Sequence, residues 1–140
     1  FFRAPTKADE REHVLEPNEI LWGVVIPSAG LKNASYEVRH KQSYDWPLAQ
    51  AAVAFQLNGN RATKVNIVLG HVAPTPLVAE AAAQALEGKE VTEATAAAAG
   101  KAATEGAKPL SQNEYKVKLV EVAVKRAILT AAGAKPYWEV

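Results

Sequence analysis

The sequence predicts an α+β domain in which a three- to four-stranded antiparallel sheet is followed by three helices packed on one of its faces. Two observations carry this prediction. Between residues 35 and 70, apolar residues recur at every second position, which is the period of half-buried strands. Beyond residue 75 they recur at helical spacing between start and stop signals. With 140 residues, of which 49% are hydrophobic and 22% charged, the chain can bury one ordinary core.

The strands are predicted from alternation and from turn residues. Three segments alternate and are expected to form an antiparallel meander: residues 35–42, 51–57 and 65–69. Asn58-Gly59-Asn60 predicts the hairpin between the second and third, because Asn and Gly accept positive φ. His40 falls on the same face as Tyr36 and Val38, so a histidine packed at the rim is expected. The apolar run from Ile20 to Ile26 predicts a further strand in its second half.

The helices are predicted from their capping signals. Thr75-Pro76 is a favourable start for a helix ending at Gly88. Thr92 is expected to cap a second helix, which Gly100 and Gly106 weaken and end. A capping box at residues 111–114 predicts the longest helix, to about residue 132. Its expected i,i+4 pairs are Glu114–Lys118 and Glu121–Lys125, and its buried side chains are Tyr115, Leu119, Val120, Val124 and Ile128.

Charge and cysteine content exclude several kinds of function. The net charge is +1, from 16 basic and 15 acidic residues, so nothing favours nucleic acid or an anionic membrane surface. The chain has no cysteine, which excludes disulfides, iron–sulfur clusters and thiolate zinc sites within it and suits a cytoplasmic location. No apolar run is long enough to span a membrane. The start at Phe1, without Met, is typical of an internal cut.

Most signatures of catalysis are missing. The three histidines lie far apart in the sequence, and no glycine-rich phosphate loop occurs. The stretch most typical of a site is Gln42 to Trp46, which places two aromatic residues and a carboxylate beside Lys41 on a loop after a strand. The two aromatic rings could stack on a flat ligand, or they could simply cover the end of the core.

The order of these features resembles the C-terminal part of the FAD-binding medium subunit of molybdenum hydroxylases, the family of xanthine dehydrogenase, carbon monoxide dehydrogenase and aldehyde oxidoreductase. The matching stretches are Phe1-Phe2, residues 14–21 leading to Val25-Ile26-Pro27, Tyr36-Glu37-Val38-Arg39, residues 49–54, residues 68–76, Glu80-Ala81-Ala82, residues 86–89 and Tyr115-Lys116. Residues 68–76 carry the strongest match, similar to the family's "GGVAPTP". The resemblance covers nearly the whole chain.

This resemblance implies a role in electron transfer. The whole subunit would hold FAD, which takes electrons from iron–sulfur clusters on a small subunit and passes them to an external acceptor. The clusters would be reduced by a molybdopterin large subunit, where the substrate is oxidised. Residues 1–31 would be the tail of the preceding FAD-binding domain, and residues 32–140 the flavoprotein C-terminal domain. The glycine-rich segments that grip FAD would precede Phe1, so FAD binding by this chain alone is expected to be weak or absent.

The resemblance also implies a cofactor-side surface. Leu21 matches a position on the flavin side, and Arg39 stands where the family usually has Lys. Tyr44, Asp45 and Trp46 match a segment beside the isoalloxazine ring. In addition, His71 replaces the second Gly of "GGVAPTP", and Lys116 replaces a common Arg.

Two functions besides the flavoprotein domain stay open. The chain could be a protein-interaction or scaffold module without a cofactor, because broad alanine faces and aromatic residues could serve protein contacts. It could also be an enzyme that acts on its own. As a flavoprotein domain or as a scaffold module, the chain alone is not expected to be active.

Overall fold

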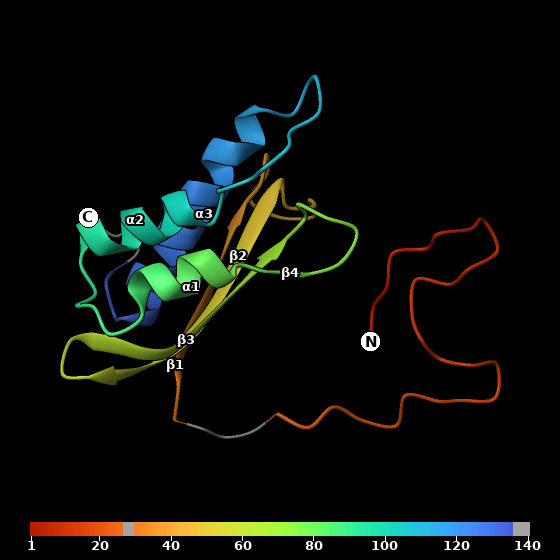
Figure 1. Ribbon diagram of the computed structural model, residues 1–140, viewed down its shortest axis with the longest axis horizontal. Helices are drawn as coiled ribbons and strands as arrows, with labels where there is room; N and C mark the ends of the chain where they lie inside the picture. The colour runs from red at the N-terminus through yellow and green to blue at the C-terminus, as the bar shows by residue number, and fades with distance from the viewer. Residues whose placement is uncertain (27–29, 136–140) are drawn as a thin grey trace.

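The fold consists of one antiparallel sheet covered on one face by three helices (Figure 1). The computed structural model describes residues 1–26 and 30–135. The sheet order is β1-β2-β3-β4, so each strand lies beside its neighbour in sequence. The elements are β1 Lys32–Val38, β2 Ala49–Asn58, β3 Arg61–Gly70, β4 Leu77–Val78, α1 Glu80–Leu86, α2 Glu93–Ala102 and α3 Tyr115–Ala131. The predicted fold class is confirmed.

The β2–β3 hairpin has the predicted turn and a bulge that was not predicted. Gly59 at the turn has a φ of +63°, which its missing Cβ allows. Further along, the register shifts between Ala54 and Gln56, and Lys64 adopts a φ of +53°. The bulge takes the backbone N–H groups of Lys64 and Val65 out of the ladder. Both donate instead to the carboxylate of Glu87, at 3.0 and 2.9 Å. Neither of these two N–H groups is therefore left unpaired at the bulge.

The core lies between the helices and the sheet face that they cover. Its largest fully buried side chains are Phe55, Ile67, Leu86, Val124 and Ile128. Alanines fill much of the remaining space, and this allows the helices to approach closely. Among the residues that the structure describes, no polar or charged residue is buried. The core is therefore held by apolar burial and close packing.

The start of α1 differs from the prediction. Leu77 and Val78 do not open a helix at Thr75-Pro76; they form β4, which pairs with Leu69 and Val68 of β3. The helix begins only at Glu80. Pairing with β3 gives the backbone N–H and C=O groups of these two residues hydrogen-bond partners. A threonine cap at the start of a helix would satisfy only some of these groups.

Helix α2 has the predicted cap, and it ends at Ala102, between the two glycines that were predicted to weaken and end it. The Thr92 and Thr95 side chains each accept from the other's backbone N–H, at 3.2 and 2.9 Å. Gly100 lies inside the helix, two residues before its end, and is buried against α3. A Cβ at Gly100 would lie 2.5 Å from the backbone oxygen of Glu121. The glycine is thus required by the close approach of α2 and α3.

Helix α3 begins without the predicted capping box. Its N-cap residue, Glu114, makes no side-chain cap, and the preceding turn is closed by the Asn113 carboxamide, which accepts from the Leu110 N–H at 2.6 Å. The charge pairs also differ. Lys118 pairs with Glu121 and Lys125 pairs with Glu93 of α2, in place of the predicted i,i+4 partners. Val120, Val124 and Ile128 are buried and Leu119 is partly buried as predicted, but Tyr115 is exposed.

The N-terminal segment, residues 1–26, carries no regular strand. The strand predicted in the second half of 20–26 is absent within the described residues, and Ile20, Trp22 and Val25 are largely exposed. Strand β1 also starts earlier and ends earlier than predicted, at Val38, which leaves His40 exposed beyond it. No helix in the described part of the chain is both long and apolar enough to cross a membrane.

Candidate functional site at the β1–β2 loop

The predicted site loop connects β1 to β2 and is braced by Asp45. The carboxylate of Asp45 accepts hydrogen bonds from the backbone N–H groups of His40 and Lys41, both at 3.0 Å. Where the loop closes, the N–H of Leu48 donates to the carbonyl of Val38 at 2.7 Å. Asp45 thus fixes the backbone of the loop, a role that its position in the sequence did not reveal.

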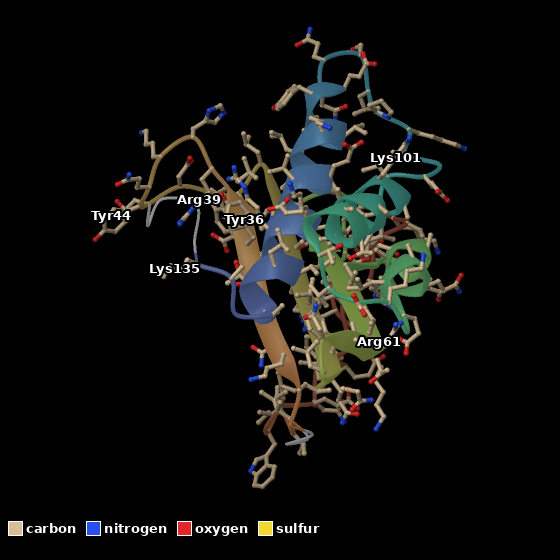
Figure 2. All side chains as sticks on the ribbon, turned by 90° about the vertical axis from the view of Figure 1, so that its left-hand side faces the viewer. Tyr36, Arg39, Tyr44, Arg61, Lys101 and Lys135 are labelled. Atoms are coloured by element: carbon tan, nitrogen blue, oxygen red, sulfur yellow. The ribbon has the colours of Figure 1, made fainter. Side chains whose placement is uncertain are left out.

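The two aromatic residues of the loop lie on the surface. Tyr44 is fully exposed, with a φ of +53°, and Trp46 is 82% exposed. Figure 2 shows Tyr44 projecting from the loop away from the helices. The alternative that these rings cover the end of the core is therefore wrong. They present flat faces to which a planar ligand or a partner surface could be stacked.

Positive charge lies at the base of the loop. The Arg39 guanidinium is 3.4 Å from the Glu37 carboxylate, and both side chains are about one-third exposed. Lys41, further along the loop, is exposed. A ligand that approached the aromatic residues would meet these cations, although Glu37 partly neutralises Arg39.

The turn after β3 supports the loop from the side. The His71 ring lies 6.2 Å from the Trp46 ring, centroid to centroid, at an angle of 53°. His71 has a φ of +63°, a region in which a residue with a Cβ is disfavoured by about 1–2 kcal/mol. This explains why a glycine suits the position in the "GGVAPTP" pattern. The carbonyl of His71 accepts from Lys116 Nζ at 2.7 Å, which ties the turn to α3.

A pair between Tyr36 and Arg126 was missed at the level of sequence. The Arg126 guanidinium donates to the Tyr36 hydroxyl and lies 5.1 Å from the ring centroid. The pair links α3 to β1 three residues before Arg39. An inward-facing tyrosine on a strand was the available signal, because its hydroxyl needs a polar partner when it is partly buried.

Leu21 is not brought to this loop. It lies half-exposed in the N-terminal segment, which Figure 1 shows apart from the β1–β2 connection. Of the five predicted site residues, the structure gathers Arg39, Tyr44, Asp45 and Trp46 on one loop. In residues 1–26 and 30–135, no three His, Asp or Glu side chains are grouped so that they could hold a metal ion.

Comparison with known families matches most of the chain. The family model of the CO dehydrogenase flavoprotein C-terminal domain matches residues 34–131. The carbon monoxide dehydrogenase medium chain of Hydrogenophaga pseudoflava is 32% identical over 127 residues, which is 87% of this chain and 44% of the relative. The medium chain of Afipia carboxidovorans is 31% identical over 122 residues, or 81% of this chain and 41% of the relative. The chain thus spans less than half the length of the curated relatives it matches.

Solved structures agree with these relatives. Quinoline 2-oxidoreductase from Pseudomonas putida 86 matches with a TM-score of 0.70 and 32% identity, over 76% of this chain and 39% of that chain. Carbon monoxide dehydrogenase from Hydrogenophaga pseudoflava, in a form lacking the Mo-pyranopterin moiety, matches with a TM-score of 0.65 and 37% identity, over 75% and 37%. The fold and the sequence therefore point to the same family.

Proposed function

Because the chain belongs to the family of CO dehydrogenase flavoprotein C-terminal domains, found in molybdenum hydroxylases, we propose that it helps to enclose FAD in an electron-transfer subunit. The observation that carries the proposal is the braced loop after β1. It holds Tyr44 and Trp46 exposed beside Arg39, on a backbone fixed by Asp45. Exposed aromatic rings on a fixed loop cost little ordering entropy when they meet a ligand.

The residues fit one part of FAD and not the other. The aromatic side chains suit the flat isoalloxazine ring, and Arg39 and Lys41 supply positive charge near it. The sequence has no glycine-rich turn of the kind that cradles a diphosphate. The flavin supplies the redox chemistry when it is bound; this chain would shield one side of the ring and orient it. We therefore propose that the diphosphate is held by a preceding FAD-binding domain.

The N-terminal segment supports this division. Residues 20–26 form an apolar run whose side chains are exposed, so they have no core to join within the described residues. We propose that residues 1–31 are the tail of the FAD-binding domain and residues 32–140 the C-terminal domain. In the whole subunit the apolar run would be covered by the domain to which it belongs.

The partners follow from the same proposal. A small subunit with iron–sulfur clusters and a large subunit with molybdopterin would dock on the full subunit, and electrons would pass from molybdenum through the clusters to FAD. The substrate would be chosen on the large subunit. The chain alone would then have no oxidoreductase activity of its own.

Titration with FAD tests whether the preceding domain, and not this chain, supplies most of the FAD binding. The 140-residue chain is expected to quench FAD fluorescence weakly or not at all, whereas the full-length subunit retains FAD through gel filtration. Tight, micromolar binding by the 140-residue chain would contradict the proposed division.

Substitution in the full-length subunit tests the loop. Trp46→Ala is expected to raise the fluorescence of bound FAD and its exposure to a soluble quencher, because one side of the ring loses its cover. Tyr115→Ala is the matched control, since Tyr115 is also an exposed aromatic residue but lies at the start of α3. Equal effects of the two substitutions, or none from Trp46→Ala, would favour the scaffold function over the flavin-side function.

A further inference from the structure

A cavity of about 350 Å³ opens beneath the connection between α2 and α3, beside the end of β3. Its deep part is apolar, since Leu69 and Val120 are almost fully buried. Val72, Leu77 and Val117 extend this apolar lining toward the mouth. The volume falls within the range of about 300–1,000 Å³ that is typical of pockets for small molecules.

The cavity exists because the covering segment does not fill it. Residues 103–114 arch over it and hold their shape through their own turns, as in the hydrogen bond from the Ala107 N–H to the Thr104 carbonyl at 3.1 Å. The large aliphatic side chain of this segment, Leu110, points outward and is 75% exposed. Ala103 and Ala107, which do line the cavity, are too small to occupy it.

The mouth carries a net positive charge. Lys108 and Lys116 line it, against the single carboxylate of Glu105. Lys116 Nζ already donates to the His71 carbonyl at 2.7 Å. An ammonium group has three N–H donors, so Lys116 can hold an anion while keeping this bond. It is positioned by the turn after β3 and does not have to be ordered when a ligand arrives.

We propose that this cavity binds a small apolar molecule that carries one acidic group, with its apolar body on Leu69 and Val120 and its anion on Lys116. An acidic group suits the net charge of the mouth, and an apolar body suits the floor. The site is distinct from the β1–β2 loop and does not depend on FAD. It lies next to that loop, because the residue whose carbonyl holds Lys116 is the one whose ring contacts Trp46.

Titration of the 140-residue chain with 8-anilinonaphthalene-1-sulfonate, an aromatic sulfonate, tests the site by fluorescence enhancement. Saturable binding at one site per chain is expected. Lys116→Gln should weaken it about tenfold, as the loss of one charge-assisted hydrogen bond predicts. Lys118→Gln is the matched control: Lys118 lies on the same helix, pairs with Glu121 and is exposed, so binding should be unchanged.

Filling the cavity gives the decisive comparison. Ala103→Leu and Ala107→Leu should each abolish the saturable enhancement while circular dichroism shows a folded chain. Enhancement that survives both fillings places the probe elsewhere, for example on the apolar run at 20–26, and overturns the proposal. Equal weakening by Lys116→Gln and Lys118→Gln also overturns it.

If both filled variants fail to fold, amide chemical shifts of the unsubstituted chain decide. Shifts centred on Val117 and Val120 during the titration support the site. Shifts confined to residues 1–26, or no saturable shifts, refute it.

Discussion

Similar apolar side chains are exposed in the N-terminal segment and buried in the sheet–helix domain. In the domain, residues 30–135, Phe55 and Ile67 are fully buried between sheet and helices. In the N-terminal segment, Trp22 is 99% exposed and Val25 is 91% exposed. Both regions have strand-forming, β-branched sequences, but only the domain has neighbouring strands to pair with. The difference teaches that an apolar run becomes a strand only where a partner backbone and a covering layer exist.

The largest effect should separate the two regions by stability. Phe55→Ala removes a fully buried ring and should lower the free energy of unfolding by about 3–5 kcal/mol. Trp22→Ala removes a larger ring that is exposed and should change the free energy of unfolding by less than about 0.5 kcal/mol. Urea denaturation followed by circular dichroism measures both. A cost of more than about 1 kcal/mol for Trp22→Ala would show that the N-terminal segment packs on the domain after all.

Glycine substitutions extend the comparison to the backbone. Gly100→Ala should destabilise the domain by about 1–3 kcal/mol, because the new Cβ would lie 2.5 Å from the Glu121 oxygen. Helix propensity alone predicts the opposite sign, a gain of about 1 kcal/mol. Gly23→Ala is the control and should be nearly neutral, because a Cβ at Gly23 would meet no atom within 4 Å beyond its chain neighbours. Thermal or urea unfolding decides which sign holds.

A smaller effect distinguishes a formed cap from one that was only predicted. Thr92→Ala removes the hydroxyl that accepts from the Thr95 N–H at 3.2 Å and should cost about 1 kcal/mol. Ser111→Ala should cost almost nothing, since α3 has no side-chain cap. Urea midpoints of the two variants give the comparison, and a similar loss in both would mean that Ser111 caps α3 in solution.

The smallest effect lies in the N-terminal segment and depends on pH. Two groups of Thr6 donate to the Glu10 carboxylate: the backbone N–H at 2.7 Å and the side-chain hydroxyl at 2.9 Å. The backbone hydrogen bond first, and the hydroxyl second, hold the pKa of Glu10 below its usual value. Since the pKa is lower in the structured turn, the bonds stabilise the turn fully above the pKa of the unstructured segment. This stabilisation is lost as pH falls through the lowered pKa.

The amide resonance of Thr6 reports this titration. Its chemical shift should follow Glu10 with a midpoint below that of glutamate in an unstructured peptide. In Glu10→Gln the shift should not titrate with pH in this range. A midpoint at the ordinary value would mean that the turn does not persist in solution.

Local signals predicted the elements whose causes are local. The alternation on β2 and β3 and the turn at Gly59 depend on neighbouring residues, and Thr92 caps its own helix. They could be predicted for that reason. Strand β4 could not be predicted in this way, because Leu77 and Val78 pair with β3. The local Thr75-Pro76 sequence contains no information about that pairing. The roles of Gly100 and Glu87 likewise depend on residues that only the fold brings near.

The candidate site also combines features that depend on neighbouring residues with features that depend on the fold. The loop with Tyr44, Asp45 and Trp46 was predicted as site-like from its composition, and its exposed aromatic residues fit that prediction. The bracing role of Asp45 and the contact between Trp46 and His71 depend on backbone geometry and on a distant turn. Whether Leu21 and the four loop residues contact a flavin stays a prediction.

The order of the elements has a consequence for how the chain matures on the ribosome. All four strands precede α3, yet α3 covers β1 and β2 (Figure 1). During synthesis the meander can pair early, because each of its strands is adjacent to the next in sequence. Helix α1 can cover part of β3 early, but the apolar face of β1 and β2 stays exposed until residue 131 has emerged from the exit tunnel. A nascent chain that stalls before Tyr115 would present β1 and β2 without the helix that covers them, and would be a target for chaperones.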